Sequence, residues 1–251
     1  MMNFRVFLMG VFLILFSSTN YTEPTASSIQ LGIENKYEQL NDYSKKLYES
    51  LDKNLSKPAY KVFHNAIAGF FKLKASHHFE NNLLTVIDFS LPSTQERMWI
   101  IDILEQKIIY QTLVAHGQKS GNLYANQFSN IPSSHQSSLG FYLTDKPYTG
   151  KHGTSLYLDG VEQGINDKAR ERAIVIHSAD YVSYDFIQKH GRLGRSHGCP
   201  AIPKKNHEEI IRLLAGKSCL YIYHDTPEYH TKTYIKPDEE SLTALINFLK
   251  E

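Results

Sequence analysis

The sequence of 251 residues has only two cysteines and almost no net charge. Lysine plus arginine (27) nearly balances aspartate plus glutamate (26), so composition gives no reason to expect a nucleic-acid or anionic-membrane partner. Neither H-E-x-x-H nor C-x-x-C occurs, and no cofactor or metal is implied. We therefore expect one globular domain of ordinary size with a small helical annex.

The N-terminus carries an apolar run that is too short to span a bilayer comfortably. Residues 6–16 are apolar, Arg5 precedes them, and Ser17 and Ser18 follow. This pattern is typical of a secretory signal, so we predict a signal peptide over residues 1–20 and export of the protein. No A-x-A cleavage site follows, and the alternative is therefore an uncleaved membrane anchor.

Hydrophobic spacing divides the rest of the chain. Residues 21–35 are polar and predict a structureless linker, whereas 36–80 predict a helical segment of two helices, the second capped by Ser56. We expect residues 81–235 to form a β-rich domain that contains the candidate catalytic residues, and residues 236–251 a C-terminal helix. The predicted strands are 84–89, 98–104, 108–114, 139–144, 155–158, 172–177 and 219–223. The fold class is mainly β with peripheral helices (α+β), and residues 120–138 are a long loop.

One segment combines residues suited to nucleophilic catalysis. Residues 191–201 read G-R-L-G-R-S-H-G-C-P-A and place Cys199 in a glycine-rich turn, while an apolar strand upstream ends in His177. A thiol must lose its proton to attack, and imidazole is the side chain best matched to take it near neutral pH. Residues 189–205 contain five lysines and arginines and no acid, which predicts a lowered thiol pKa. Gly198 would let backbone N–H groups approach a substrate.

Three other interpretations of the same residues remain open. Cys199 could form a disulfide with Cys219, although the strand-like surroundings of Cys219 favour a buried thiol. Ser196 stands in a G-x-S-x-G pattern, which would make it the nucleophile of a serine hydrolase, but the flanking sequence does not predict the required strand and helix. A zinc site could use His177, His190, His197 and Cys199.

The segment S-H-G-C, preceded by a strand that ends in I-H-S, resembles the catalytic motif of L,D-transpeptidases (YkuD-type). The form G-R-S-x-G-C-P-A is similar to the subgroup described as murein L,D-transpeptidase catalytic domain proteins of Gram-negative bacteria. The resemblance extends over most of the chain after residue 55. It implies a β-sandwich or barrel with an N-terminal helical annex and a periplasmic location; an uncleaved anchor would hold the enzyme at the membrane, facing the periplasm.

The resemblance also implies roles for individual residues. Cys199 would be the nucleophile and His177 its base, with the backbone carbonyl of Ser178 orienting the imidazole. The backbone amides of His197, Gly198 and Cys199 would form the oxyanion hole.

Substrate binding is less well defined by the motif. Ala201 stands where the family usually has asparagine or arginine, so we expect Arg192 or Arg195 to bind the substrate carboxylates instead. Ser196 and His152, the latter in a loop, complete the candidate substrate-binding residues.

The resemblance implies peptidoglycan stem peptides as partners and carbapenems as inhibitors. The protein would be peripheral to the cell wall. Cys199 would attack a stem tetrapeptide, expel D-alanine and pass the acyl group to an amine. The acceptor could be another stem, a lipoprotein lysine, a free D-amino acid or water, the last giving carboxypeptidase activity. A non-catalytic wall-binding module is the remaining alternative.

Overall fold

The computed structural model describes residues 26–51, 55–77, 79, 81–151, 153–233 and 235–250, with the backbone alone for 26–36. The predicted signal peptide and the first residues of the predicted linker lie outside this range. Among the described residues, no helix combines the length and the apolar character needed to cross a bilayer.

Within the described residues, eight strands form one mixed sheet in the order β3-β2-β1-β8-β4-β5-β6-β7. The strands are β1 (Leu83–Asp88), β2 (Met98–Asp102), β3 (Lys107–Thr112), β4 (Gly140–Gly150), β5 (Gly153–Gly160), β6 (Val175–Ser178), β7 (Ala201–Ile202) and β8 (Cys219–Tyr223). The β1–β8 and β6–β7 pairs are parallel and the others antiparallel.

The two edges of this sheet meet through the chain that follows β3. The N–H of Ala115 donates to the carbonyl of Ala201 in β7, at 2.9 Å. The sheet is therefore a nearly closed barrel, which confirms the predicted fold of β-structure with peripheral helices. Closure of the barrel brings the chain that follows β3 next to β7, the edge strand that contains Ala201.

Buried β-branched and aliphatic side chains explain why the central strands form. Every residue of β1 and of β8 is buried, and both strands were predicted to within a residue at each end. Two strands differ more. β4 continues to Gly150 because residues 147–150 pair with β5 beyond a register shift. β6 begins at Val175, three residues later than expected, because Ala173 has a left-handed φ of 52°.

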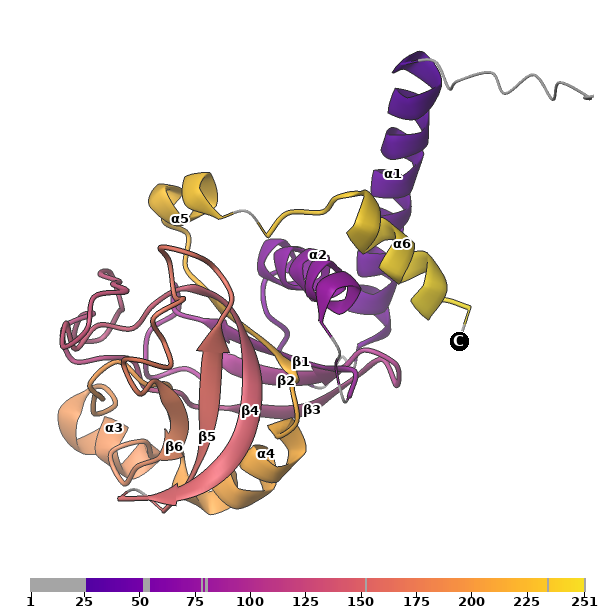
Figure 1. Cartoon of the computed structure of the whole chain (residues 1–251). Helices are drawn as coiled ribbons and strands as arrows, with labels where there is room; N and C mark the ends of the chain where they lie inside the picture. The colour runs from indigo at the N-terminus through magenta and orange to yellow at the C-terminus, as the bar shows by residue number, and fades with distance from the viewer. Residues whose placement is uncertain are drawn as a thin grey trace, which may run out of the picture.

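Three helices form the annex on one side of the barrel (Figure 1): α1 (Ala26–Ser50), α2 (Tyr60–Ser76) and α6 (Glu239–Phe248). The helix α1 begins inside the predicted linker, so that prediction is wrong for residues 26–35. This stretch contains good helix formers and no proline, so a helix fixed by packing further along can extend through it. Ser56 is not a helix cap either, since α2 begins at Tyr60.

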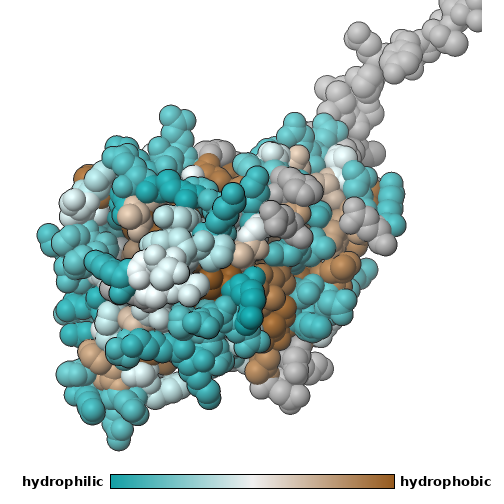
Figure 2. Space-filling model, turned by 60° about the horizontal axis from the view of Figure 1, so that its bottom comes forward, coloured by the Kyte–Doolittle hydropathy of each residue, from teal (hydrophilic) through white to brown (hydrophobic). Residues whose placement is uncertain are grey.

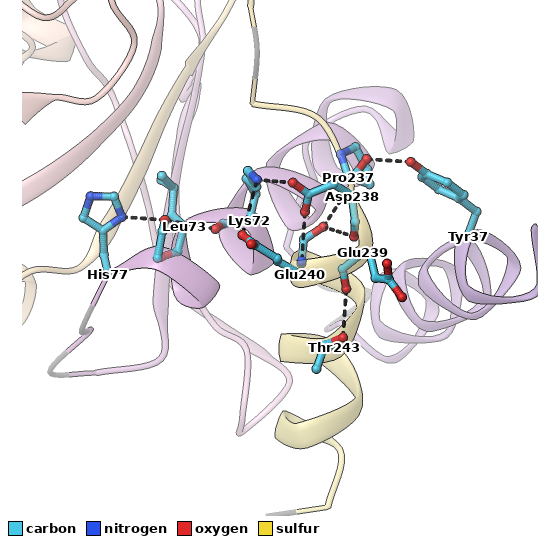
Figure 3. A network of polar contacts seen from close by, with 11 residues as sticks. Tyr37, Lys72, Leu73, His77, Pro237, Asp238, Glu239, Glu240 and Thr243 are labelled. Carbon is cyan, nitrogen blue, oxygen red and sulfur yellow. Dashed lines mark hydrogen bonds and ion pairs between the residues drawn. The ribbon is translucent and has the colours of Figure 1, made fainter. Parts of the chain in front are cut away.

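Polar contacts fasten α6 to the other two annex helices (Figure 3). The hydroxyl of Tyr37 in α1 donates to the carbonyl of Pro237, at 2.7 Å, and Lys72 in α2 forms an ion pair with Asp238. Asp238 also caps α6, because its side chain accepts from the N–H of Ser241 and the hydroxyl of Ser241 accepts in return. The C-terminal helix is thus joined to both N-terminal helices.

The helix α2 joins the annex to the barrel through a close approach at Gly69. A Cβ atom at this position would lie 2.0 Å from the ring of Phe141 in β4, so only glycine allows the helix this close. The ring of Phe141 stacks in turn on Tyr221 of β8, with centroids 4.1 Å apart. Annex and barrel therefore share one hydrophobic core.

The remaining helices are α3 (Tyr184–His190), α4 (His207–Leu214), preceded by the 3-10 turn η1 (Lys204–Asn206), and α5 (Pro227–Lys232). The helix α4 packs against β4, β5 and β6. Hydrophilic residues cover most of the face seen in Figure 2, with smaller areas of hydrophobic residues among them.

Candidate active site

Parallel pairing of β6 with β7 brings the predicted nucleophile and base to one place. His177 of β6 lies opposite Ala201 of β7, and Cys199 precedes Ala201 by two residues. The imidazole is buried, and its Nδ1 lies 3.0 Å from the carbonyl oxygen of Ser178. A proton on Nδ1 in this contact makes Nε2 the basic nitrogen. This is the geometry expected of a base whose orientation is set by a third group.

Hydrogen bonds inside the cysteine turn fix its shape. The hydroxyl of Ser196 donates to the carbonyl of Cys199 at 2.6 Å and accepts from the N–H of Gly198 at 3.0 Å. The carbonyl of Gly198 accepts from the hydroxyl of Ser137, at 3.0 Å. Gly198 has a φ of 125°, and a Cβ atom there would lie 2.7 Å from the carbonyl of Gln136. Only glycine fits this position without strain.

The segment after β3 supports the cysteine turn from the other side. The N–H of Ser196 donates to the carbonyl of His116 at 3.0 Å, and the N–H of Gln118 donates to the carbonyl of Ser196 at 2.8 Å. Beneath this segment, Arg97 and His116 are both fully buried, with Nη2 of Arg97 2.8 Å from Nδ1 of His116. Burial and the charge of Arg97 lower the pKa of His116 to about 3, so its imidazole is neutral and can accept this bond.

The pKa of the cysteine differs from the sequence-based prediction. The side chain of Cys199 is partly exposed, and its sulfur lies 3.6 Å from the carbonyl of Ala173. Burial of the sulfur raises the thiol pKa, and this outweighs the lowering by the Val175 N–H and by the charges of Arg172 and Lys151. The predicted lowering by the basic residues of 189–205 is therefore wrong. The cations with the largest effect come from other parts of the chain.

Arg172 was missed because it lies within the predicted strand 172–177. The turn at Ala173 releases it from the strand, and its guanidinium binds the long loop instead. Nη1 donates to the carbonyl of Ser129 and Nη2 to that of Gln136, at 2.6 and 2.5 Å. Arg172 thus holds the predicted loop 120–138 beside the cysteine turn. The only sequence signal was a cation shortly before the strand that carries His177.

The structure places the other predicted residues in different surroundings. A nitrogen of Arg195 donates to Asn122 Oδ1 at 2.7 Å and to the carbonyl of Gly121 at 3.1 Å, and Arg192 donates to the carbonyl of Leu193. The exposed ring of His197 stacks on that of His135, with centroids 4.3 Å apart. His152 lies outside the described residues.

A cavity of about 630 Å³ adjoins the site next to Ser178, the residue that follows His177. It lies between the turn of the β4–β5 hairpin, the chain after β6 and the start of α4. Its lining residues are Thr149, Lys151, Gly153, Thr154, Ser178, Ala179, Asp180, Tyr181, Lys204, His207 and Glu208. Neither Arg192 nor Arg195 is among them.

The geometry does not support the disulfide, the zinc site or the serine nucleophile that the sequence left open. Both cysteines are free thiols, with Cys199 in the turn and Cys219 buried in β8, so the disulfide is not formed. Within the described residues, no group of three or more His, Cys, Asp or Glu side chains is placed to hold a metal ion. Ser196 is buried and is followed by β7 rather than a helix, which does not match a nucleophile elbow.

Residues 54–223 match the sequence family described as the L,D-transpeptidase catalytic domain, over well more than half of the chain. The chain belongs to this family. No curated protein sequence matches the chain significantly.

Several solved structures are similar to this L,D-transpeptidase family member. One is an L,D-transpeptidase from Mycobacterium smegmatis, 10% identical with a TM-score of 0.36 over 57% of this chain and 59% of the other. Another is LdtMt1 in complex with imipenem, 12% identical with a TM-score of 0.35, over 57% and 59%. The cell-shape determining protein Pgp2 of Campylobacter jejuni is 14% identical with a TM-score of 0.39, over 74% and 63%. The chain thus spans about three fifths of each of these proteins.

Proposed function

We propose that this protein is an exported peptidoglycan L,D-transpeptidase that uses Cys199 as its nucleophile and His177 as its base. The observation that carries the proposal is the pairing of β6 with β7, which sets the cysteine turn beside an imidazole held by its neighbour's carbonyl. Family membership supports the reaction class. The apolar run at residues 6–16 supports a periplasmic location at the wall.

In the first half-reaction, His177 takes the thiol proton as the sulfur attacks the carbonyl of the third residue of a stem tetrapeptide, at the L-centre of diaminopimelate. The tetrahedral intermediate collapses, the bond to D-alanine breaks, and His177 returns the proton to the leaving amine. A thioester on Cys199 remains. In the second half-reaction an acceptor amine attacks the thioester, gives its proton to His177, and releases the sulfur, which regains that proton.

The raised thiol pKa favours proton transfer during attack over a preformed thiolate. The backbone amides of His197 and Cys199 remain candidates for the oxyanion hole. The N–H of Gly198 is already donated to Ser196, so its proposed role in the turn is to fix the backbone instead. Each well-placed donor contributes about 10²–10³ in rate.

The test is exposure of the purified protein to imipenem, followed by intact-mass measurement. Wild-type protein should gain one adduct, and Cys199→Ala none. Cys219→Ala is the matched control, because that thiol is buried, and it should be acylated like the wild type. Full acylation of Cys199→Ala would rule out the cysteine mechanism, and loss of that adduct in Ser196→Ala would indicate a serine nucleophile.

Incubation with a stem tetrapeptide then distinguishes the activities of a protein that forms the adduct. Release of D-alanine with a 3→3 dimer indicates transpeptidation, and release with a tripeptide alone indicates carboxypeptidase activity. Binding of the peptide without release, together with no imipenem adduct, would indicate a wall-binding module instead.

A further inference from the structure

The cavity beside Ser178 is lined by side chains of both charges. Two of them, Asp180 and Lys204, form an ion pair with 2.7 Å between Oδ1 and Nζ, so these two charges compensate each other. Lys151 and Glu208 form no ion pair with any described residue. The cavity therefore offers one uncompensated cation and one uncompensated anion, which suits a ligand that carries both charges.

The proposed reaction requires a binding place for the amine that leaves and for the amine that enters. The amine that leaves and the amine that enters exchange a proton with the same base, so both must stand on the side of the thioester that faces His177. The cavity is lined by Ser178, which follows His177 in β6, and by Lys151, whose charge acts on the Cys199 thiol. On the proposed function, the leaving amine is that of D-alanine and carries a carboxylate on the same carbon. A cation in the cavity is needed to bind that group.

Lys151 is the cation in position to do so. It lies in the turn of the β4–β5 hairpin, is exposed, and is close enough to Cys199 for its charge to act on the thiol. The arginines of the cysteine turn are bonded to backbone carbonyls and to Asn122 instead.

We infer that Lys151 binds the carboxylate next to the reacting nitrogen, first that of the leaving D-alanine and then that of the entering amine. The inference rests on the proposed function. It assigns this cavity to amino-acid-type amines, and it favours a stem-peptide centre or a free D-amino acid as acceptor. A protein lysine side chain has no carboxylate on the carbon bearing its amine and would gain nothing from Lys151.

The experiment compares two donors that differ only in the terminal carboxylate. One is a stem tetrapeptide ending in D-alanine, and the other is the same peptide ending in D-alaninamide. Release of the terminal residue is measured as kcat/KM for wild type, Lys151→Ala, Lys151→Arg and Lys146→Ala. Lys146 is an exposed lysine of β4 that does not line the cavity, so its removal changes net charge equally. Acylation by imipenem checks separately that each variant has a competent Cys199.

We expect Lys151→Ala to lose about tenfold with the acid donor, the size expected for one partly exposed charge-assisted hydrogen bond, and less than about twofold with the amide. Lys151→Arg should retain most of the preference for the acid, and Lys146→Ala all of it. An equal loss on both donors, or the same loss in Lys146→Ala, would overturn the assignment. If wild type forms the imipenem adduct but releases neither terminal residue, the proposed function fails, and this inference with it.

Discussion

The helical annex and the cysteine turn are held together by different forces. In the annex, the ring of Phe71 packs between Tyr43 of α1 and Phe248 of α6, with centroids 5.7 and 5.5 Å away. In the turn at residues 196–199, the contacts are hydrogen bonds that end on backbone groups, from Ser137 and Ser196. Apolar packing tolerates small adjustments of position, whereas a bonded turn fixes atoms to within a fraction of an ångström.

This difference separates stability from activity. Substitutions in the annex remove buried apolar area and should lower the free energy of unfolding without moving Cys199. Substitutions in the turn remove little apolar area but displace Cys199, the proposed nucleophile, and small displacements of a reacting group are costly in rate.

The largest expected effect is on stability, from Phe71→Ala. Phe71 is fully buried, and truncating such a ring costs about 3–5 kcal/mol through lost burial and the cavity left behind. Urea unfolding should show this loss, while the folded protein should react with imipenem at the wild-type rate. Leu249→Ala is the matched control, since Leu249 is exposed and should cost no more than about 0.5 kcal/mol. Slow acylation of folded Phe71→Ala would show that the annex does position the site.

The next effect is on rate, from Gly198→Ala. The new methyl group would meet the carbonyl of Gln136, and the residue would have to keep a φ of 125°, so the turn must shift. We expect imipenem acylation to slow about 100-fold, equivalent to about 2.7 kcal/mol of barrier.

Gly164→Ala provides the comparison for Gly198. Gly164 also has a positive φ, of 76°, but nothing lies within 4 Å of its added Cβ. It should cost about 1 kcal/mol of stability and leave acylation unchanged. Equal slowing in both variants would mean that general backbone strain, and not the position of the turn, explains the loss.

Secondary structure was predicted well where the sequence has a continuous apolar pattern. The β-branched run of β1 and the strand containing Cys219 have continuous apolar patterns, and their ends were located to within a residue. The helix α3 was missed although Ser183 caps its start and Gly191 its end, because it buries no residue and so has no hydrophobic period.

The candidate site could be predicted from the sequence as far as the motif extends. Cys199 and His177 could be proposed as nucleophile and base because a thiol and an imidazole indicate this chemistry by their residue type. Arg172 and Lys151 could not be proposed, because their relation to the thiol arises from tertiary structure: a turn at Ala173 and the β4–β5 hairpin, whose turn carries Lys151. The sign of the thiol pKa shift was wrong for the same reason, since the charge count of a loop says nothing about how deeply a sulfur is buried.

The smallest expected effect is on the pKa of the Cys199 thiol. It is measured for the removal of Arg172, which acts on the thiol in the folded structure, and of Arg192, which is close to it in sequence. Burial raises the pKa of Cys199, so the thiolate forms only as pH rises through a value above the usual range of about 8.5. Iodoacetamide alkylation of the wild type, followed by mass, should therefore increase with pH and reach its midpoint above about 8.5. Cys219 is buried and should not react, which Cys199→Ala verifies.

Removing a cation destabilises the thiolate, so Arg172→Gln should move this midpoint upward by up to about one pH unit. Arg192→Gln removes the same charge from the cysteine loop, and it should leave the midpoint in place because Arg192 is not among the main charges acting on the thiol. Arg172→Lys keeps the charge and should stay close to the wild type. A larger shift in Arg192→Gln than in Arg172→Gln, or a wild-type midpoint below about 8.5, would show instead that the basic residues of 189–205 lower the thiol pKa.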